Sequence, residues 1–176
     1  MIKYEELERI LEKNKNIQYP EVPRLYPNKR YCNLIYDSLG GEKGELTAIT
    51  QYSYQSIILK KEERISNILK EIAIEEMKHL EILGNIIVNL GEKPIYMNSK
   101  GNAWTAESLT YNDNLKEIIY SNIKAEEEAI LGYKNILKYT NNIALRRIYE
   151  RIILDETTHL EIFKSIANNL NIQLKI

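Results

Sequence analysis

Apolar residues recur along most of the chain with the three- and four-residue spacing of amphipathic helices. This spacing predicts helices over residues 3–15, 42–60, 62–90, 113–139 and 143–169. Gly91 and Pro94 end the helix over 62–90, and Thr140-Asn141-Asn142 separates the last two helices. Because no alternating strand pattern competes with these helices, we expect an all-α protein.

The segment after the first helix is extended, because Pro20, Pro23 and Pro27 lie within eight residues of one another. Residues 30–39 predict one or two helical turns, interrupted by Gly40-Gly41. We therefore assign residues 1–30 to a helical and extended N-terminal arm.

A long connection over residues 91–111 is rich in Gly, Asn, Ser and Pro. A connection of this length can span a bundle and join parallel neighbours, whereas short turns join antiparallel ones. The pattern therefore predicts a ferritin-like four-helix bundle with a long second crossover connection. We assign residues 31–176 to this bundle.

The two halves of the predicted bundle repeat each other. With an offset of 80 residues, segment 72–83 aligns with 152–163, and six of the twelve pairs are identical. With an offset of 81 residues, segment 45–52 aligns with 126–133, and Glu, Ala, Ile and Tyr coincide. The repeat indicates that one helix hairpin occurs twice, with its polar residues in matching places.

The chain has two histidines, and each follows a glutamate by three positions: Glu76 with His79, and Glu156 with His159. Residues i and i+3 share one helix face, with Cβ atoms about 5–6 Å apart, so the carboxylate and the imidazole can reach one ion. Apolar neighbours, Met77 among them, indicate that both pairs face inward.

Each remaining helix adds one inward glutamate, Glu45 or Glu126, and the repeat selects Glu126 from the consecutive run 126–128. Four glutamates and two histidines match the ligand set of dinuclear carboxylate bundles. Two divalent cations would balance the four negative charges. These donors suit manganese or iron, whereas zinc prefers four-coordinate sites. The alternative is a polar seam of salt bridges with neutral histidines.

Further polar residues are candidates for supporting roles. Tyr52 and Tyr133 each lie seven residues after a glutamate of this set, where a phenol either hydrogen-bonds a carboxylate of the facing helix or packs in the core. Glu75 and Asp155 each lie four residues before a histidine. One of them could accept the ring N–H of a histidine across the bundle, and the alternative is exposed charge.

Composition narrows the function further. The net charge of −1 and the pI near 6.2 predict no general surface for nucleic acid or anionic membranes. The apolar runs are too short for a bilayer, and the acidic N-terminus is unlike a signal peptide. The single cysteine, Cys32, excludes an internal disulfide and is expected to be a small buried residue. We expect a soluble cytoplasmic protein.

Several motifs resemble those of the manganese catalases and of the short spore-coat proteins related to them. Segment 40–47 resembles their first-helix motif, and segment 72–81 resembles their second. Segment 98–105 resembles their Gly-Asn-Pro-Trp connection, with Ala103 in place of the proline, and Gln18-Tyr19-Pro20 also fits. The likeness covers nearly the whole chain from about residue 17.

The resemblance implies a dimanganese site that disproportionates hydrogen peroxide. It implies that the metal ligands are Glu45, Glu76, His79, Glu126 and His159. It also implies that Glu156 is a ligand or a nearby proton-handling carboxylate. Glu156, Tyr52 and Tyr133 are therefore the candidate catalytic residues. The chain departs from some family members in carrying Ala125 where they have an arginine beside the ligand glutamate.

Two other families share part of this pattern. Bacterioferritins can bind haem between subunits through a methionine at the position of Met77, and rubrerythrins carry an extra glutamate where this chain has Ala129. One alternative is therefore a di-iron ferroxidase or peroxide reductase that uses two iron ions and acts on dioxygen or peroxide. Another is a non-catalytic coat or storage-shell component, which would be spore-associated. These bundles often associate, so we expect a homo-oligomer in which residues 1–30 could form a contact arm.

Overall fold

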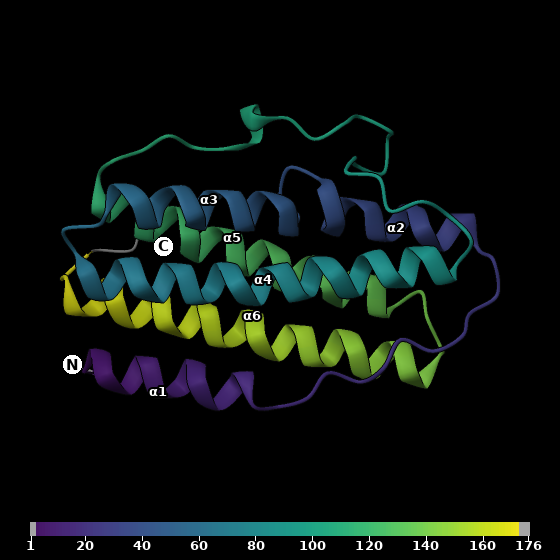
Figure 1. Ribbon diagram of the computed structural model, residues 1–176, viewed down its shortest axis with the longest axis horizontal. Coiled ribbons are helices and arrows are strands. Elements are labelled where there is room, and N and C mark those ends of the chain that lie inside the picture. The colour runs from purple at the N-terminus through teal and green to yellow at the C-terminus, as the bar shows by residue number, and fades with distance from the viewer. Residues whose placement is uncertain (1–2, 173–176) are drawn as a thin grey trace.

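The computed structural model describes residues 3–172, and the regular secondary structure of that range is helical (Figure 1). The helices are α1 (Tyr4–Lys15), α2 (Lys29–Gly40), α3 (Glu45–Ile58), α4 (Glu63–Asn89), the 3₁₀ helix η1 (Ala106–Ser108), α5 (Leu115–Leu137) and α6 (Ile143–Asn169). One isolated β-bridge joins Met97 and Ala103. The prediction of an all-α protein is confirmed.

Helices α3, α4, α5 and α6 form the four-helix bundle, in which α3 pairs with α4 and α5 pairs with α6. The connection from α4 to α5 runs along the outside of the bundle for most of its length, so α4 and α5 run parallel (Figure 1). The ferritin-like topology with a long second crossover connection is therefore confirmed. None of the helices in the described range is both long and apolar enough to cross a membrane.

The helix starts follow local chemistry. Asn28, Asn114 and Asn142 each accept hydrogen bonds from backbone N–H groups in the first turns of α2, α5 and α6. Helix α3 begins after Gly44 and carries Glu45 in its first turn, where the helix dipole favours a carboxylate. The observed boundaries of the long helices lie within a few residues of the predicted ranges.

Helix α2 is longer than predicted, because the expectation was only one or two turns. Its buried residues recur at helical spacing: Tyr31, Cys32, Ile35, Tyr36 and Leu39. Gly40 ends this helix, and a Cβ atom there would lie 2.7 Å from the backbone nitrogen of Met97 in the crossover connection. The glycine pair therefore ends the helix and admits the crossing chain, rather than interrupting the helix. The expectation that Cys32 is buried is confirmed.

The apolar core is divided into two clusters along the bundle axis. On α4 the buried apolar residues from 65 to 73 belong to one cluster, and those from 83 onward belong to the other. On α6 the residues from 162 to 167 and those from 145 to 152 divide in the same way. The helix segments between the clusters carry buried polar and charged side chains, which form a polar layer across the middle of the bundle.

The N-terminal arm lies against the bundle. Helix α1 packs on α4 and α6, and Leu7 and Leu11 are buried in the first apolar cluster. The extended segment that follows reaches the far end of the bundle, where the Asn28 backbone N–H donates to the Leu90 carbonyl. The division into an arm over 1–30 and a bundle over 31–176 stays a prediction.

Candidate metal centre

The polar layer brings together all six residues that the sequence predicts as metal ligands. Helix α3 contributes Glu45, α4 contributes Glu76 and His79, α5 contributes Glu126, and α6 contributes Glu156 and His159. Each of these side chains is buried, with at most 4% of its residue surface exposed. The two repeated halves of the sequence therefore contribute equally to the centre, since each half supplies two carboxylates and one imidazole.

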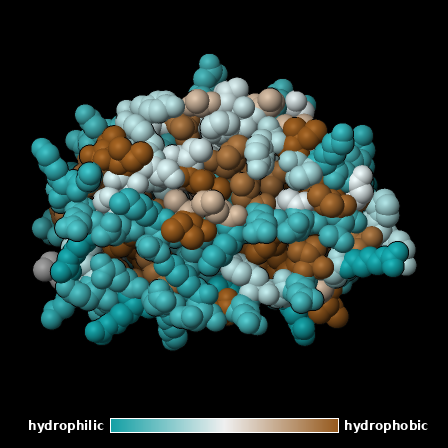
Figure 2. Space-filling model, viewed as in Figure 1, coloured by the Kyte–Doolittle hydropathy of each residue, from teal (hydrophilic) through white to brown (hydrophobic). Residues whose placement is uncertain are grey.

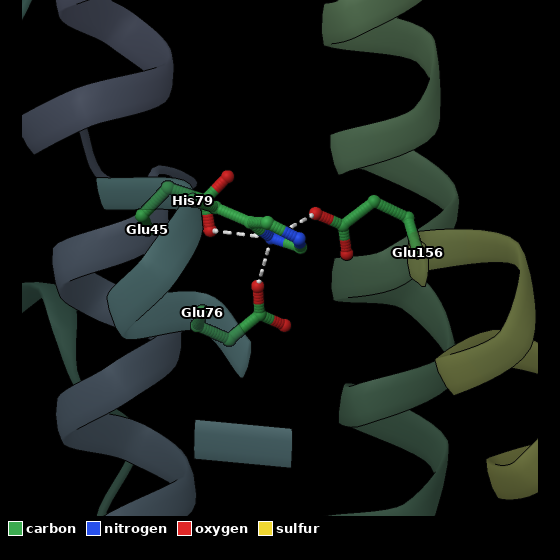
Figure 3. A group of neighbouring side chains, drawn as sticks. All are labelled: Glu45, Glu76, His79 and Glu156. Carbon is green, nitrogen blue, oxygen red and sulfur yellow. Dashed lines mark hydrogen bonds and ion pairs between the residues drawn. The ribbon is translucent and has the colours of Figure 1, made fainter. Parts of the chain in front are cut away.

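The six residues form two overlapping clusters. Glu45, Glu76, His79 and Glu156 make the first, and Glu76, Glu126, Glu156 and His159 make the second. Within each cluster the potential ligand atoms lie within 4.8 Å of one another. Figure 3 shows the first cluster, in which carboxylates from three helices turn toward one edge of the His79 ring. Because Glu76 and Glu156 belong to both clusters, their carboxylates lie between two candidate metal positions.

Both imidazoles direct their Nδ1 atoms into the centre. The Nδ1 atom of His79 lies 2.8 Å from Glu76 Oε2 and 3.1 Å from Glu156 Oε1. The Nδ1 atom of His159 lies 3.1 Å from Glu76 Oε1 and 3.6 Å from Glu156 Oε2. Nδ1 is therefore the nitrogen that each histidine offers to an ion.

The outer nitrogens of both rings are held by acidic residues from the facing helix. His79 Nε2 lies 3.2 Å from Asp155 Oδ2, and His159 Nε2 lies 2.7 Å from Glu75 Oε2. The prediction that one of these acids binds a ring N–H across the bundle is confirmed, and both do. Such a partner fixes the tautomer and the ring orientation and leaves Nδ1 free for a cation.

Two buried phenols hold the outer carboxylates. The Tyr52 hydroxyl on α3 donates to Glu126 Oε1 on α5 at 2.5 Å, and the Tyr133 hydroxyl on α5 donates to Glu45 Oε1 on α3. Burial raises the pKa of the Tyr52 phenol well above its ordinary value, and the nearby Glu126 carboxylate raises this pKa further. The phenol therefore stays protonated and remains a donor. Of the two alternatives for these tyrosines, the hydrogen bond to a facing carboxylate is the one that the structure shows.

The electrostatics of the layer favour cations. Burial raises the pKa of Glu45 well above its ordinary value, and the neighbouring Glu76 and Glu156 carboxylates raise this pKa further. Burial also opposes the charge on His79, but carboxylates, Asp155 foremost, outweigh burial and raise the pKa of His79 well above its ordinary value. In the absence of ions, protons thus balance the carboxylates. Two divalent cations would replace these protons, because ligand nitrogens and carboxylates bind metal in their deprotonated forms.

Some inward atoms have no hydrogen-bond partner of good geometry within residues 3–172. They are both carboxylate oxygens of Glu156 and the Nδ1 atom of His159. Buried polar atoms without a partner are rare in folded proteins, and an ion is one explanation for them. The ion pairs of a salt-bridge seam leave these atoms without aligned hydrogen bonds, whereas two cations would coordinate them, so the donor set fits a dinuclear metal site.

A cavity of about 210 Å³ reaches the centre from the side between α3 and α5, and the four glutamate carboxylates line it. Small residues shape its wall, namely Ala48, Ala125, Ala129 and Gly132. At its rim Lys43 and Glu128 pair at 3.2 Å. The side-chain amide of Gln51 exchanges two hydrogen bonds with the backbone of Thr110, which ties the crossover connection to the rim. Sequence reasoning missed this rim, because the crossover carries no periodic pattern that places it.

Two expectations about neighbouring residues have different outcomes. Met77 was expected inside, but its side chain is 56% exposed. Met77 is turned about 100° around α4 from Glu76, in the direction opposite to the buried Glu75, and this side of the helix faces outward. Glu127, which follows Glu126 and was expected to point away from the centre, pairs with Lys124 and Lys164 on the outer side of α5.

Sequence reasoning also missed three residues around the His79 half of the centre. Asn14 and Tyr19 from the arm and Arg151 from α6 all contact Asp155, the acid that holds His79. The segment Gln18-Tyr19-Pro20 was noticed as a family motif, but nothing in its spacing relates it to a histidine 60 residues later.

Comparisons with known proteins identify relatives that are similar in sequence and in fold. A sequence model of the family described as "Manganese containing catalase" matches residues 10–94. A "Probable manganese catalase" of Clostridium acetobutylicum is 27% identical over 164 residues, covering 81% of this chain and 72% of the relative. The crystal structure of KatB, a manganese catalase from Anabaena, matches with a TM-score of 0.80 and 27% identity, covering 89% of this chain and 78% of that chain. A bacterioferritin of Desulfovibrio desulfuricans is 30% identical over 132 residues, covering 72% of this chain and 69% of the relative.

Proposed function

Because this chain belongs to the manganese catalase family within the ferritin-like superfamily, we propose that it disproportionates hydrogen peroxide to dioxygen and water at a dimanganese centre. The observation that carries the proposal is the pair of ligand clusters that share Glu76 and Glu156 at the cavity. These shared carboxylates would hold two ions close together, so that both could act on one small molecule.

The proposed ligands are Glu45, Glu76, His79, Glu126 and His159, and Glu156 is either a sixth ligand or a nearby proton-handling carboxylate. The four carboxylates carry four negative charges, which two Mn²⁺ ions neutralise. Oxygen donors with two imidazoles suit manganese, and iron is the alternative because it accepts the same donors. When bound, the metal pair supplies positive charge at the peroxide and the capacity to exchange two electrons.

The cavity is the proposed route and binding place for peroxide. Its volume of about 210 Å³ is many times the roughly 10–15 Å³ that one water needs by a comparable measure, so a two-oxygen molecule fits. The small side chains of Ala125 and Ala129 leave the carboxylates accessible from this side.

Glu156 is the proposed proton carrier. Oxidation of one peroxide to dioxygen releases two protons and two electrons, and reduction of a second peroxide to two waters consumes the same numbers. Glu156 lines the cavity, and neither of its carboxylate oxygens is occupied by a well-aligned donor within the described residues. It is therefore placed to hold a proton between the two half-reactions. Tyr52 and Tyr133 act through the carboxylates that they hold, and we assign them positioning roles.

The second candidate is an iron-dependent ferroxidase or peroxide reductase, which the likeness to a bacterioferritin favours. Both candidates use the same six ligands, so the metal and the product distinguish them.

The first experiment is elemental analysis of protein purified from its native host, combined with an oxygen-electrode assay after addition of hydrogen peroxide. Two Mn per chain with release of dioxygen supports the catalase. Two Fe per chain without release of dioxygen would refute it and support the iron enzyme. A non-catalytic coat component would instead show assembly into large particles and negligible peroxide turnover.

A pair of variants tests the proton carrier. In Glu156→Gln the shape is kept but the proton-accepting carboxylate is lost, so we expect the rate of dioxygen release to fall by about 10²–10⁴-fold. Glu127→Gln changes the same residue type on the outer side of α5 and should leave this rate unchanged. Equal rates for both variants, measured at equal metal content, would contradict the role of Glu156.

The chain is also proposed to work as a homo-oligomer in the cytoplasm, with association with spores as the alternative location. Several large apolar side chains are exposed, with Ile57 at 71%, Leu131 at 63% and Ile143 at 67%. On the face drawn in Figure 2, apolar side chains gather in separate patches among polar ones. Light scattering on the purified protein measures the oligomeric state, and a monomer would contradict the proposal.

A further inference from the structure

The two halves of the centre differ in what surrounds them. Glu75 and Asp155 occupy matching positions in the repeat, and each holds the outer nitrogen of one histidine. Glu75 uses one oxygen for His159, and its other oxygen, Oε1, has no hydrogen-bond partner within residues 3–172. Asp155 has partners on both oxygens besides His79. The internal repeat therefore does not extend to the groups that support the histidines.

The additional partners of Asp155 come from the N-terminal arm. The Asn14 side chain, in the last turn of α1, donates to Asp155 Oδ1 at 2.7 Å. The Tyr19 hydroxyl, in the extended segment, donates to Asp155 Oδ2 at 2.5 Å. The same hydroxyl oxygen lies 3.2 Å from His79 Nε2, and the two rings meet edge to face at 6.0 Å. Tyr19 thus contacts both the histidine and the acid that holds it.

Arg151 anchors the arm at this place. Its guanidinium pairs with Asp155 and donates to the backbone carbonyls of Asn14 at 2.8 Å and of Ile17 at 3.1 Å. It also lies 4.5 Å from the centre of the Tyr19 ring, which is the range of a cation–π contact. Arg151 therefore fixes the arm backbone on both sides of the turn that presents Tyr19 to the centre.

We propose that the N-terminal arm, through Tyr19 and Asn14, positions His79 and sets the metal affinity of the Glu45–Glu76–His79–Glu156 position, whereas the position at His159 is independent of the arm. The inference rests on the proposed function to the extent that it takes the six residues as ligands of two metal ions. Removal of a group that orients a ligating histidine typically lowers metal affinity by about 10–100-fold. The two positions are therefore unequal, although their ligands are related by the repeat.

The test is the Tyr19→Phe variant of the full chain. It removes one hydroxyl and keeps the aromatic ring under Arg151, so the fold of the arm is preserved. We expect manganese affinity to fall about tenfold or more at one of the two positions and to stay unchanged at the other. Calorimetric titration with Mn²⁺ measures the two affinities. Anomalous diffraction from crystals grown at limiting Mn²⁺ then shows which position has lost occupancy, and we expect it to be the His79 position.

Two variants provide matched controls. Tyr36→Phe removes a hydroxyl that donates to the Lys93 carbonyl at 2.7 Å instead of to a residue of the centre, and it should leave both affinities unchanged. Glu75→Gln disturbs the other half and should weaken the His159 position alone. A Tyr19→Phe protein in which both positions weaken equally, or in which neither weakens, would overturn the proposal.

The test does not depend on catalysis. A wild-type chain that binds two Mn²⁺ ions but releases no dioxygen would refute the proposed catalase, and a selective loss at the His79 position in Tyr19→Phe would still support the role of the arm. A wild-type chain that binds fewer than two ions would overturn both proposals.

Discussion

Removal of the metal ions with a chelator should lower the thermal stability of this protein substantially. The six proposed ligands come from four helices, so the unfolded chain does not present them together and should bind the ions weakly by comparison. Ions that bind the folded state selectively stabilise it by mass action. The effect is sizeable here because the ion-free layer holds four carboxylates that are at most 4% exposed.

The magnitude follows from two bound ions. At a free Mn²⁺ concentration about 100-fold above the dissociation constant, each ion contributes about 2.7 kcal/mol, so two contribute about 5.4 kcal/mol. For a chain of 176 residues each kcal/mol shifts Tm by roughly 2–4 °C. The loaded protein should therefore melt about 10–20 °C above the chelated one.

The assay is differential scanning calorimetry of one preparation with and without chelator, followed by re-addition of Mn²⁺. Glu76→Gln is the informative variant, because Glu76 belongs to both clusters and its loss should remove at least half of the metal-dependent shift. A wild-type shift below about 3 °C, equivalent to roughly 1 kcal/mol, would refute the reasoning that the buried layer is a metal site.

Three further changes have defined expected outcomes. Tyr133→Phe leaves the carboxylate that it holds without its donor, so Mn²⁺ affinity should fall about 10–100-fold in a chelator-competition assay; an affinity equal to that of Tyr36→Phe would contradict this. Ala129→Phe should fill the cavity and abolish release of dioxygen while the Mn content stays at two per chain, whereas Leu131→Phe, on the exposed side of the same helix, should leave the rate unchanged. Full activity of Ala129→Phe would show that peroxide enters elsewhere. Burial raises the pKa of the Cys32 thiol, so at pH 8 this thiol should resist alkylation in the folded protein and react only after denaturation. Mass spectrometry measures the labelling. Rapid labelling of the folded chain would count against the burial of Cys32.

The sequence predicted which six residues meet in the polar layer, because local geometric rules place them. A glutamate and a histidine three positions apart must share a helix face, whatever the rest of the fold does. The internal repeat then matched Glu126 with Glu45 and removed the ambiguity of three consecutive glutamates. The same rules failed for Met77, since an apolar type was taken as evidence of burial although its place beside Glu76 turns it outward.

The length of α2 and the rim of the cavity were beyond local rules. The Gly40-Gly41 pair is equally compatible with a break inside a helix and with an end of a helix. The close approach of the crossover backbone to Gly40 shows that the pair ends the helix. Likewise the contact between Gln51 and Thr110 joins residues 59 positions apart in the sequence, and no periodicity relates them.

Taken alone, the sequence determined the helices, their ferritin-like order and the six residues that meet between them, because helical periodicity and the repeat act over distances of a few turns. The tertiary structure decided which imidazole nitrogen faces the centre, where the cavity opens and how the two halves differ. Those features depend on contacts between distant segments, such as Tyr19 with Asp155 and His79. Packing of the arm against α6 sets these contacts, and residue spacing along one helix carries no information about them.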